Sequence, residues 1–223
     1  MNNNIHIFYH CYLVNNCISV IGEQMRLLKK TGLAKEACTI NISLIGTREY
    51  CEFVRTTYFH SLGDNVNVFF ESDFNMYEYP AIKKLWDMSN TVLSPSDLVF
   101  YFHTKGVTQP YNQAVGHWRD LLNYFNIERY QDAIDSLNNA AYNTYGVNWH
   151  KNHYSGNFWW TYAGHIQNLT EPVFSDTLEA RQQLEYWVSG YPNMNPYLKP
   201  YCAFESGVNH YTDLFPRERY VKD

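Results

Sequence analysis

Hydrophobic and polar positions follow two patterns along the first 106 residues of the chain. Short apolar runs rich in β-branched and aromatic residues alternate with stretches in which apolar positions recur at helical spacing. These patterns predict four strands, at residues 5–13, 38–45, 66–70 and 97–102. They predict three helices between them, at 18–31, 48–59 and 80–89. Such alternation is typical of βαβ units, so it predicts a mostly parallel sheet with right-handed crossovers.

Two of the predicted helices have clear boundary residues. In the helix at 18–31, Ile21, Met25 and Leu28 fall on one face, and Gly32 supplies a residue that readily ends a helix. Pro80 opens the helix at 80–89, because proline is tolerated in the first helical turn.

The fourth predicted strand, DLVFYF at 97–102, is apolar at every position from Leu98 onward. A continuous apolar run indicates a strand that is covered on both faces, so we expect it at the centre of the sheet. In open α/β sheets, ligands bind in the crevice outside the carboxyl ends of the strands. The residues that follow this strand are therefore the first candidates for a functional site.

The second half of the chain has a different pattern. It predicts a long helix, a short strand, an aromatic loop and a last helix, at residues 115–142, 145–149, 154–160 and 177–188. The tail is rich in Tyr, Pro and Asn and is expected to form loops across the sheet. Residues 1–223 therefore read as one domain, with an α/β fold.

Composition excludes several classes of protein. The net charge of −5 and the absence of clustered Lys and Arg argue against nucleic-acid binding. The five cysteines form no CxxC pair and are odd in number, which fits a reducing compartment. No apolar stretch is long enough to span a bilayer, so we expect a soluble, cytoplasmic protein. Aromatic residues make up 17% of the chain, a content that suits both core packing and stacking on sugars or bases.

Three polar groups follow the central strand. Lys105 can neutralise a diphosphate as a point charge, and Gly106 allows close approach of the backbone to a ligand. His103 can hydrogen-bond a phosphate oxygen or bind a metal. The alternative is that these residues form only a polar turn.

Three more charged residues are candidates for the same crevice. Arg119 follows Trp118 near the start of the long predicted helix and offers a planar fork for phosphate; the alternative is an Arg that packs beside the Trp. Glu71 and Asp73 follow the third strand, where they can accept hydrogen bonds from a base or a ribose. Alternatively, they only cap the following helix.

The segment HYSGNFWW at 153–160 combines a small turn with paired aromatic residues. Carbohydrate sites commonly place amides beside aromatic rings, so His153, Asn157, Trp159 and Trp160 are candidate sugar or acceptor contacts. Packing in the core is the alternative for at least one of the two tryptophans.

Arg181 and Glu185 are four residues apart on the last predicted helix and therefore share one of its faces. Glu185 is a candidate general base if this face points to the crevice, and a partner in a structural ion pair if it does not. The chain contains no GxGxxG after its first strand, no P-loop, no G-x-S-x-G and no H-E-x-x-H. Dehydrogenase, P-loop NTPase, serine hydrolase and zincin functions therefore lose support.

Several short motifs, taken together in this order, resemble a known family. It is the group of small GT-A-like glycosyltransferases found in bacterial polysaccharide loci and in large DNA viruses that glycosylate their own capsids, including the chlorella viruses. The motifs are Tyr79-Pro80 before LW at 85–86, YFHTKG at 101–106, WR at 118–119, SGNFWW at 155–160, Glu185-x-Trp187, and SGVNHY at 206–211. The resemblance covers most of the chain.

The resemblance implies a GT-A-like three-layer α/β/α sandwich around a central, mostly parallel, mixed sheet. It also implies a nucleotide sugar at the carboxyl ends of the first strands. Most members hold a divalent metal with a D-x-D motif after the fourth strand, and His103-Thr104-Lys105 stands there instead. We therefore favour no required cofactor, with Lys105 replacing the metal. The alternative is Mn²⁺ or Mg²⁺ held by His103 with Glu71, Asp73 or His210.

The function expected on these grounds is transfer of a sugar from a nucleotide donor, of which a UDP-sugar is favoured, to a glycan acceptor in polysaccharide or glycoprotein assembly. Residues 1–106 form the nucleotide-sugar half and 107–223 the acceptor and catalytic half. Glu185 is the base, Lys105 stabilises the leaving group, and inversion is slightly favoured. The alternatives are a non-catalytic carbohydrate-binding module and another nucleotide-using transferase, such as a nucleotidyltransferase.

Overall fold

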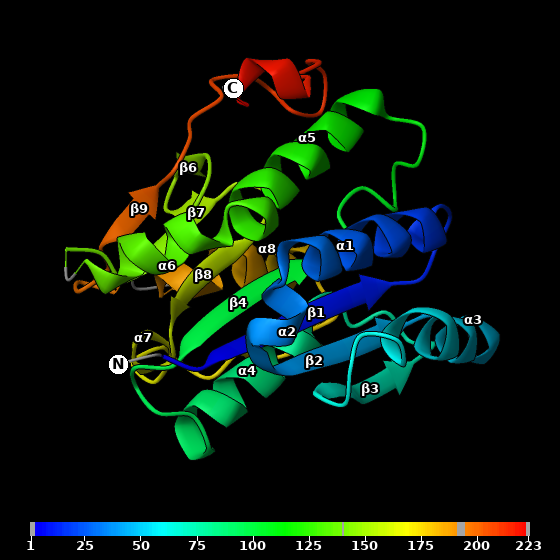
Figure 1. Ribbon diagram of the computed structural model, residues 1–223, viewed down its shortest axis with the longest axis horizontal. Coiled ribbons are helices and arrows are strands. Elements are labelled where there is room, and N and C mark those ends of the chain that lie inside the picture. Colours follow the sequence, from blue (N-terminus) through cyan, green and yellow to red (C-terminus); the bar gives the residue numbers. More distant parts are fainter. Residues whose placement is uncertain (1–2, 140, 191–194, 222–223) are drawn as a thin grey trace.

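The computed structural model describes residues 3–139, 141–190 and 195–221 (Figure 1). A sheet of seven strands in the order β3-β2-β1-β4-β8-β5-β9 forms the middle of the molecule. β8 is antiparallel to both its neighbours, β4 and β5, and the other pairs are parallel. The strands are β1 (Ile5–Tyr12), β2 (Ala37–Ile45), β3 (Val66–Ser72), β4 (Leu98–His103), β5 (Thr144–Gly146), β8 (Trp159–Tyr162) and β9 (Pro200–Cys202). A separate two-stranded ribbon pairs β6 (Trp149–His150) with β7 (His153–Tyr154).

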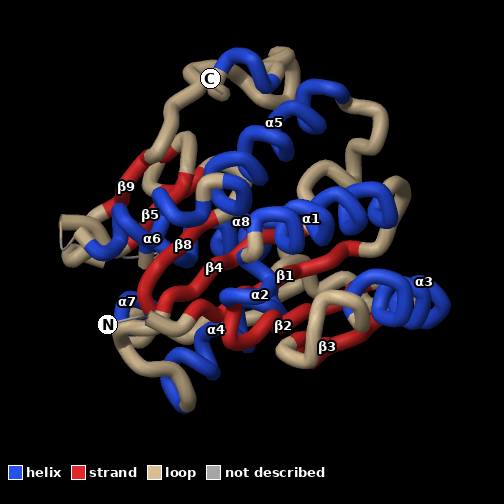
Figure 2. The backbone as a smooth tube through the Cα atoms, viewed as in Figure 1, coloured by secondary structure: helices blue, strands red, loops and turns tan. Residues whose placement is uncertain are grey.

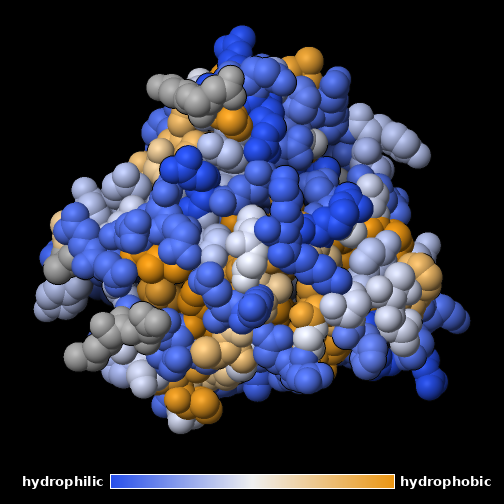
Figure 3. All heavy atoms as spheres, viewed as in Figure 1, coloured by the Kyte–Doolittle hydropathy of each residue, from blue (hydrophilic) through white to orange (hydrophobic). Residues whose placement is uncertain are grey.

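Helices cover both faces of the sheet (Figure 2). The face nearer the viewer in Figure 1 carries α1 (Cys17–Thr31), α2 (Leu33–Glu36), α5 (Gln113–Asn123) and α6 (Tyr130–Asn138), with α3 (Arg48–Val54) beside them. The opposite face carries α4 (Tyr79–Thr91), α7 (Ala163–Ile166) and α8 (Leu178–Tyr186). The outer surface of the nearer layer is mainly hydrophilic, with scattered hydrophobic patches (Figure 3).

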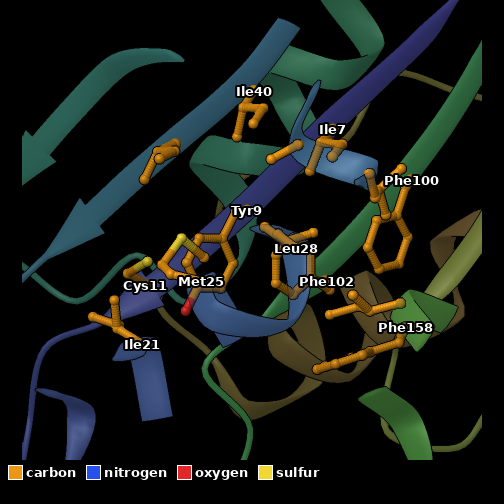
Figure 4. Close-up of a cluster of buried hydrophobic side chains, with 14 of the residues drawn as sticks. Ile7, Tyr9, Cys11, Ile21, Met25, Leu28, Ile40, Phe100, Phe102 and Phe158 are labelled. Carbon is orange, nitrogen blue, oxygen red and sulfur yellow. The ribbon is translucent and has the colours of Figure 1, made fainter. Parts of the chain in front are cut away.

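Each face of the sheet has its own hydrophobic core, because successive strand residues point to opposite sides. Ile7 and Tyr9 of β1 pack with Phe100 and Phe102 of β4 against α1, as Figure 4 shows. Phe8 points the other way, into the core beneath α4 and α7. Aromatic rings form a continuous stack through the first core: Tyr9 lies on Phe102, Phe102 on Phe100 and Phe100 on Trp160.

The predicted fold class is confirmed: the chain forms a three-layer α/β/α sandwich around a mixed, mostly parallel sheet. β4 is the middle strand of seven and lies between β1 and β8, as its apolar run predicted. Gly32 ends α1 in the left-handed conformation, with a φ of 85°. The helix predicted at 48–59 is α3 followed by one π-helical turn at Arg55–Phe59.

The single long helix predicted at 115–142 is wrong. The structure divides this segment into α5, a π-helical turn at Tyr124–Glu128, and α6. The turn is held from outside the helix, because the Tyr145 hydroxyl donates to the Phe125 carbonyl (3.1 Å) and the Trp160 indole donates to the Asn126 carbonyl (3.0 Å). These long-range hydrogen bonds compensate for the irregular backbone, and local spacing carries no sign of them.

The aromatic loop predicted at 154–160 is also wrong in part. Its last two residues begin β8, which joins the sheet between β4 and β5. Trp159 packs in one core and Trp160 in the other, so the paired rings belong to opposite faces of one strand. In the described ranges, no helix has the length and apolar character needed to cross a membrane.

Candidate active site

An open pocket lies at the carboxyl ends of β1 and β4. Its wall includes His10, Glu78, His103, Lys105, Arg181 and Tyr211, and we call it the β1–β4 pocket. His10 and His103 are paired in the parallel register of the two strands, so both reach the same edge of the sheet. The other four come from the segment before α4, the loop after β4, α8 and the C-terminal segment. The fold thus gathers charged side chains from distant parts of the chain at this edge.

The turn after β4 places Lys105 in this pocket. The backbone N–H of Thr104 donates to the His10 carbonyl (3.0 Å), and the Thr104 hydroxyl accepts from the N–H of Tyr12 (2.9 Å). Gly106 then adopts a left-handed conformation with a φ of 89°. A Cβ at Gly106 would lie 3.0 Å from Val115, so both the backbone conformation and the close approach to α5 require glycine.

Lys105 is a desolvated cation that lies on an aromatic ring. Its ammonium nitrogen is 3.7 Å from the centroid of the Trp118 ring and 5.9 Å from that of Tyr211. Among the described residues, no carboxylate oxygen lies within 4 Å of it. Burial lowers the pKa of Lys105 to about 8, although Glu185 and Glu78 raise it in part. The pocket therefore offers a positive charge that no described carboxylate neutralises at contact distance.

Contacts of His210 hold the Trp118 ring, on which Lys105 lies, in place. His210 stacks on Trp118 with centroids 5.2 Å apart and planes 12° apart. The Asn148 side-chain amide and the Ser206 hydroxyl both lie within 3.0 Å of His210 Nε2, and Asn148 also accepts from the N–H of Ser206. Burial lowers the pKa of His210 to about 4, so the imidazole is neutral at physiological pH.

Glu78 lines the candidate site, and the sequence analysis did not select it. Its Oε2 accepts hydrogen bonds from the Tyr101 hydroxyl (2.7 Å) and from the side-chain amide of Asn157. In the sequence, the one indication of Glu78 is that a carboxylate stands just before Tyr79-Pro80. Sequence analysis instead selected Glu71 and Asp73, which lie closer to the end of β3.

Those two carboxylates lie elsewhere. Glu71 forms an ion pair with Arg55 at 2.9 Å, and Asp73 is exposed; neither is among the residues that line the β1–β4 pocket. Arg119 also lies outside the pocket wall. Its guanidinium pairs with Glu23 (3.0 Å) and donates to the carbonyl of Lys105 (3.3 Å), so it holds the backbone of the turn.

His103 lies deep in the pocket. Its Nε2 is 3.0 Å from the Gly156 carbonyl, which can only accept, so Nε2 carries the proton. Burial, followed by the charge of Lys105, lowers the pKa of His103 to about 3. Nε2 is also the His103 nitrogen nearest Glu78, at 3.8 Å from Oε1. Because Nε2 donates its proton to the Gly156 carbonyl, it does not suit a metal.

The other residues considered as metal ligands, Glu71, Asp73 and His210, do not form a metal site with His103 among the described residues either. Glu71 and Asp73 lie away from His103, and Nε2 of His210 already accepts hydrogen bonds. Within the part of the chain that the structure describes, no three His, Cys, Asp or Glu side chains come together as a group that could hold a metal ion.

α8 brings Arg181 and Glu185 to the same end of the sheet. Arg181 lines the pocket, with its guanidinium 5.5 Å from the centre of the Tyr77 ring. Glu185 is half-buried, and burial raises its pKa, as does the charge of Glu78; Lys105, Arg181 and His153 oppose this rise. Glu185 is not among the residues that line the pocket, but a raised pKa and electrostatic coupling to Lys105 and Arg181 are properties of a general base.

The predicted sugar platform does not have exposed rings. Trp159 and Trp160 are both 0% exposed, and Trp160 stacks on Phe100 in the core. Asn157 is buried and accepts from the Trp159 indole (2.8 Å) while donating to Glu78. His153 packs on the ring of Tyr186, with centroids 4.4 Å apart. The core alternative therefore describes both tryptophans, because neighbouring strand residues point into the two cores.

Comparisons with known proteins identify one family and two solved structures of distant similarity. No curated protein matches the chain in sequence. The crystal structure of 4-diphosphocytidyl-2C-methyl-D-erythritol synthase from Anaerococcus prevotii DSM 20548 is similar at a TM-score of 0.45 and 9% identity, covering 97% of this chain and 94% of that chain. A second crystal structure of 4-diphosphocytidyl-2C-methyl-D-erythritol synthase gives a TM-score of 0.42 and 9% identity, covering 99% and 96%. A family model matches residues 8–198, and the chain belongs to that family, which is described as "Domain of unknown function (DUF8361)".

Proposed function

We propose that this protein is a glycosyltransferase that moves a sugar from a nucleotide donor, a UDP-sugar in the first instance, to a glycan acceptor in the cytoplasm. The observation that supports it most is Lys105, a desolvated cation without a carboxylate at contact distance, in the same pocket as Arg181 and near Glu185. A diphosphate supplies the anionic oxygens that such a pair of cations binds best.

The proposed reaction uses these groups in one displacement. The oxygen of an acceptor hydroxyl attacks the anomeric carbon, and Glu185 takes its proton. The bond between that carbon and the diphosphate oxygen breaks, and the diphosphate leaves with the electron pair. Lys105 and Arg181 stabilise the negative charge that develops on it. One base acting alone favours inversion at the anomeric carbon. Residues 1–106 supply most of the wall of the donor pocket, and 107–223 supply Arg181 and Tyr211 to that wall together with the proposed base, Glu185.

In this proposal the leaving group needs no metal, because the two cations of Lys105 and Arg181 take its place. Mn²⁺ or Mg²⁺ arriving with the nucleotide remains the alternative. A non-catalytic carbohydrate-binding module is less well supported, because both predicted platform tryptophans are fully buried. Another nucleotide-using transferase, such as a nucleotidyltransferase, would use the same two cations and differ in the atom attacked.

Thermal unfolding with UDP, GDP, CMP and dTDP, each with and without Mn²⁺, tests the proposal. A ligand that binds only the folded chain raises the melting temperature by mass action. We expect UDP to raise it most, with no requirement for Mn²⁺, and Lys105→Ala to abolish the rise. If no nucleotide changes the melting temperature while a saccharide does, the carbohydrate-binding function replaces this one.

A further inference from the structure

A second cavity adjoins the β1–β4 pocket on the far side of the turn after β4. Residues at the start of α5 and in the loop before it line most of it, together with the residue that precedes α1; we call it the Tyr111 cavity. Its wall includes Asn16, Gln109, Tyr111, Gln113, His117 and Asp120. Gly106 and Gln109 line both cavities, so only this turn separates them.

The frame of the Tyr111 cavity is fixed by hydrogen bonds between its segments. The Asn15 side-chain amide donates to the Val107 carbonyl at 2.7 Å, which ties the turn before α1 to the loop after β4. The Asn112 side chain caps α5 by accepting from the N–H of Val115, and it donates to the Tyr211 carbonyl at 3.1 Å. The cavity is therefore held between three segments and does not depend on a single loop.

The charge of this cavity differs from that of the β1–β4 pocket. Arg119 is the guanidinium in its wall, and Glu23 neutralises it at 3.0 Å. Asp120 adds a carboxylate, the pKa of which burial raises. A wall with a neutralised cation and one carboxylate disfavours an anion, so the chemistry suits an uncharged polar ligand.

The polar groups of the wall suit a molecule with many hydroxyls. Three side-chain amides, those of Asn16, Gln109 and Gln113, combine donors and acceptors, which a sugar hydroxyl can satisfy in both directions. Oδ1 of Asn16 and Nδ1 of His117 are buried without a hydrogen-bond partner among the described residues. A ligand hydroxyl that reached either atom would supply the hydrogen-bond partner that the atom lacks.

Tyr111 supplies the aromatic surface that the buried tryptophans do not. Its side chain is 98% exposed at the rim of the cavity, where a flat ring with a polar tip can stack on the apolar face of a sugar. Gly116 forms part of the wall, and a Cβ built on it would meet no atom within 4 Å. The helix is thus open at the place where a ligand would lie against it.

We infer that the Tyr111 cavity binds a neutral saccharide and, resting on the proposed function, that this saccharide is part of the acceptor. The turn at Gly106 and Gln109 then lies between the diphosphate of the donor and the bound saccharide unit, and the reacting hydroxyl belongs to a part of the acceptor that extends past the turn into the β1–β4 pocket. The division by charge explains why Lys105 and Arg181 face one cavity while the guanidinium of Arg119 is neutralised in the other.

Gly116→Leu is the decisive variant, with Gly116→Ala as its matched control. Both replace a helical glycine and favour the helix, but only leucine fills the cavity. Saturation-transfer NMR with the methyl glycosides of glucose, galactose, mannose, rhamnose and N-acetylglucosamine would measure binding. We expect at least one to bind the unmodified chain and Gly116→Ala, and to lose its signal with Gly116→Leu. Tyr111→Ala should weaken that binding about tenfold, whereas Tyr197→Ala, an exposed tyrosine elsewhere, should not.

Nucleotide binding, followed separately by thermal unfolding with UDP, distinguishes the two proposals. One outcome is that a saccharide binds, that Gly116→Leu abolishes this binding, and that UDP does not bind. This outcome would support saccharide binding in the Tyr111 cavity and would remove the cavity's role as an acceptor site. UDP binding without any glycoside signal overturns this inference and leaves the proposed function in place. Glycoside binding that Gly116→Leu leaves unchanged also overturns it, since the ligand then lies elsewhere.

Discussion

The ammonium group of Lys105 lies over the ring of Trp118, 3.7 Å from its centroid, while His210 stacks on Trp118. The aromatic ring partly compensates the charge without neutralising it, because a cation over an indole keeps its full charge. An anion that enters the β1–β4 pocket therefore meets a cation held in a fixed position. The first prediction concerns the protonation state of that cation.

Affinity for UDP should fall as the pH rises through about 8, the pKa to which burial lowers Lys105. Only the ammonium form attracts the diphosphate, so well above this pH the affinity should fall about tenfold per pH unit. Titration calorimetry at several pH values measures the slope. Lys105→Arg should keep its affinity into this range, because a guanidinium stays charged. Equal slopes for the two proteins would remove Lys105 from the diphosphate site.

The lowered pKa of Lys105 has the opposite effect on the free energy of unfolding, which should rise with pH. In the unfolded chain Lys105 keeps its proton up to the ordinary lysine pKa of 10.5, whereas in the folded chain it loses the proton at a pKa of about 8. Between these pH values the unfolded state binds more protons, so the contribution of Lys105 to stability rises with pH. Lys105→Met should lack this contribution in denaturant titrations. A difference between the two proteins that does not change from pH 8 to 10.5 would contradict the lowered pKa.

Arg119 and Arg181 should respond differently to replacement by alanine. Arg119→Ala leaves Glu23 without its cation partner and should lower the free energy of unfolding by about 1–3 kcal/mol. Arg181→Ala removes an exposed side chain of α8 that lines the pocket, so it should weaken UDP binding about tenfold or more with little loss of stability. Melting temperature and UDP affinity, measured on both variants, decide; the reverse pattern would restore Arg119 as the phosphate contact.

The first half of the fold could be predicted from the sequence because each strand and helix there has a local pattern of its own. The apolar run at 98–102 also fixed the centre of the sheet, because such a run is stable only when both faces are covered. The second half could not be predicted as well. Its π-helical turn depends on hydrogen bonds from Tyr145 and Trp160, which are distant in sequence.

The site was accessible to sequence analysis only where it follows a strand. His103 and Lys105 were selected because they end or follow β4, and Glu185 because it shares a helical face with Arg181. Arg181 itself, which lines the pocket, was considered only as the partner of Glu185, and Arg119 was selected as the phosphate contact. Glu78 was missed, because its hydrogen bonds to Tyr101 and Asn157 exist only once three segments have come together. Trp159 and Trp160 were misjudged for a related reason: a pair of tryptophans has the same sequence whether it lies in a loop or in a strand between two cores.

Glu185→Gln should lower turnover by about 10² to 10⁴ while donor affinity changes little, because glutamine keeps the size of the side chain but cannot accept the proton. Turnover should also decline on the acid side at a pH above 4.5, the ordinary pKa of a glutamate, since burial and Glu78 raise the pKa of this base. Nucleotide release and the melting temperature are measured on one sample. A destabilised variant with near-normal turnover would move the base to Asp176, Glu179 or Glu205.

Excess EDTA should leave at least part of the transfer or donor-hydrolysis activity. Lys105 and Arg181 supply the charge compensation in the proposed reaction, and His103 has its Nε2 engaged with the Gly156 carbonyl. The measurement is nucleotide release before and after chelation and after addition of Mn²⁺. Complete loss with EDTA that Mn²⁺ restores would show that the reaction depends on a metal.

Glu78→Gln should move both limbs of the pH profile of turnover to lower pH. The charge of Glu78 raises the pKa of Glu185 and also that of Lys105, so its removal lowers both. The acid limb, set by ionisation of Glu185, and the alkaline limb, set by loss of the Lys105 proton, should therefore shift in the same direction. Glutamine still offers an acceptor to the Tyr101 hydroxyl, which limits the loss of stability.

Glu49→Gln is the matched control for that experiment, because it makes the same change of net charge at an exposed position of α3. It should leave both limbs in place, since solvent and salt screen a distant surface charge. If Glu78→Gln shifts neither limb, Glu78 does not couple to the two groups that carry the proposed chemistry. If it shifts the limbs apart, at least one of them belongs to a different residue, because a single lost negative charge lowers the pKa of every group near it.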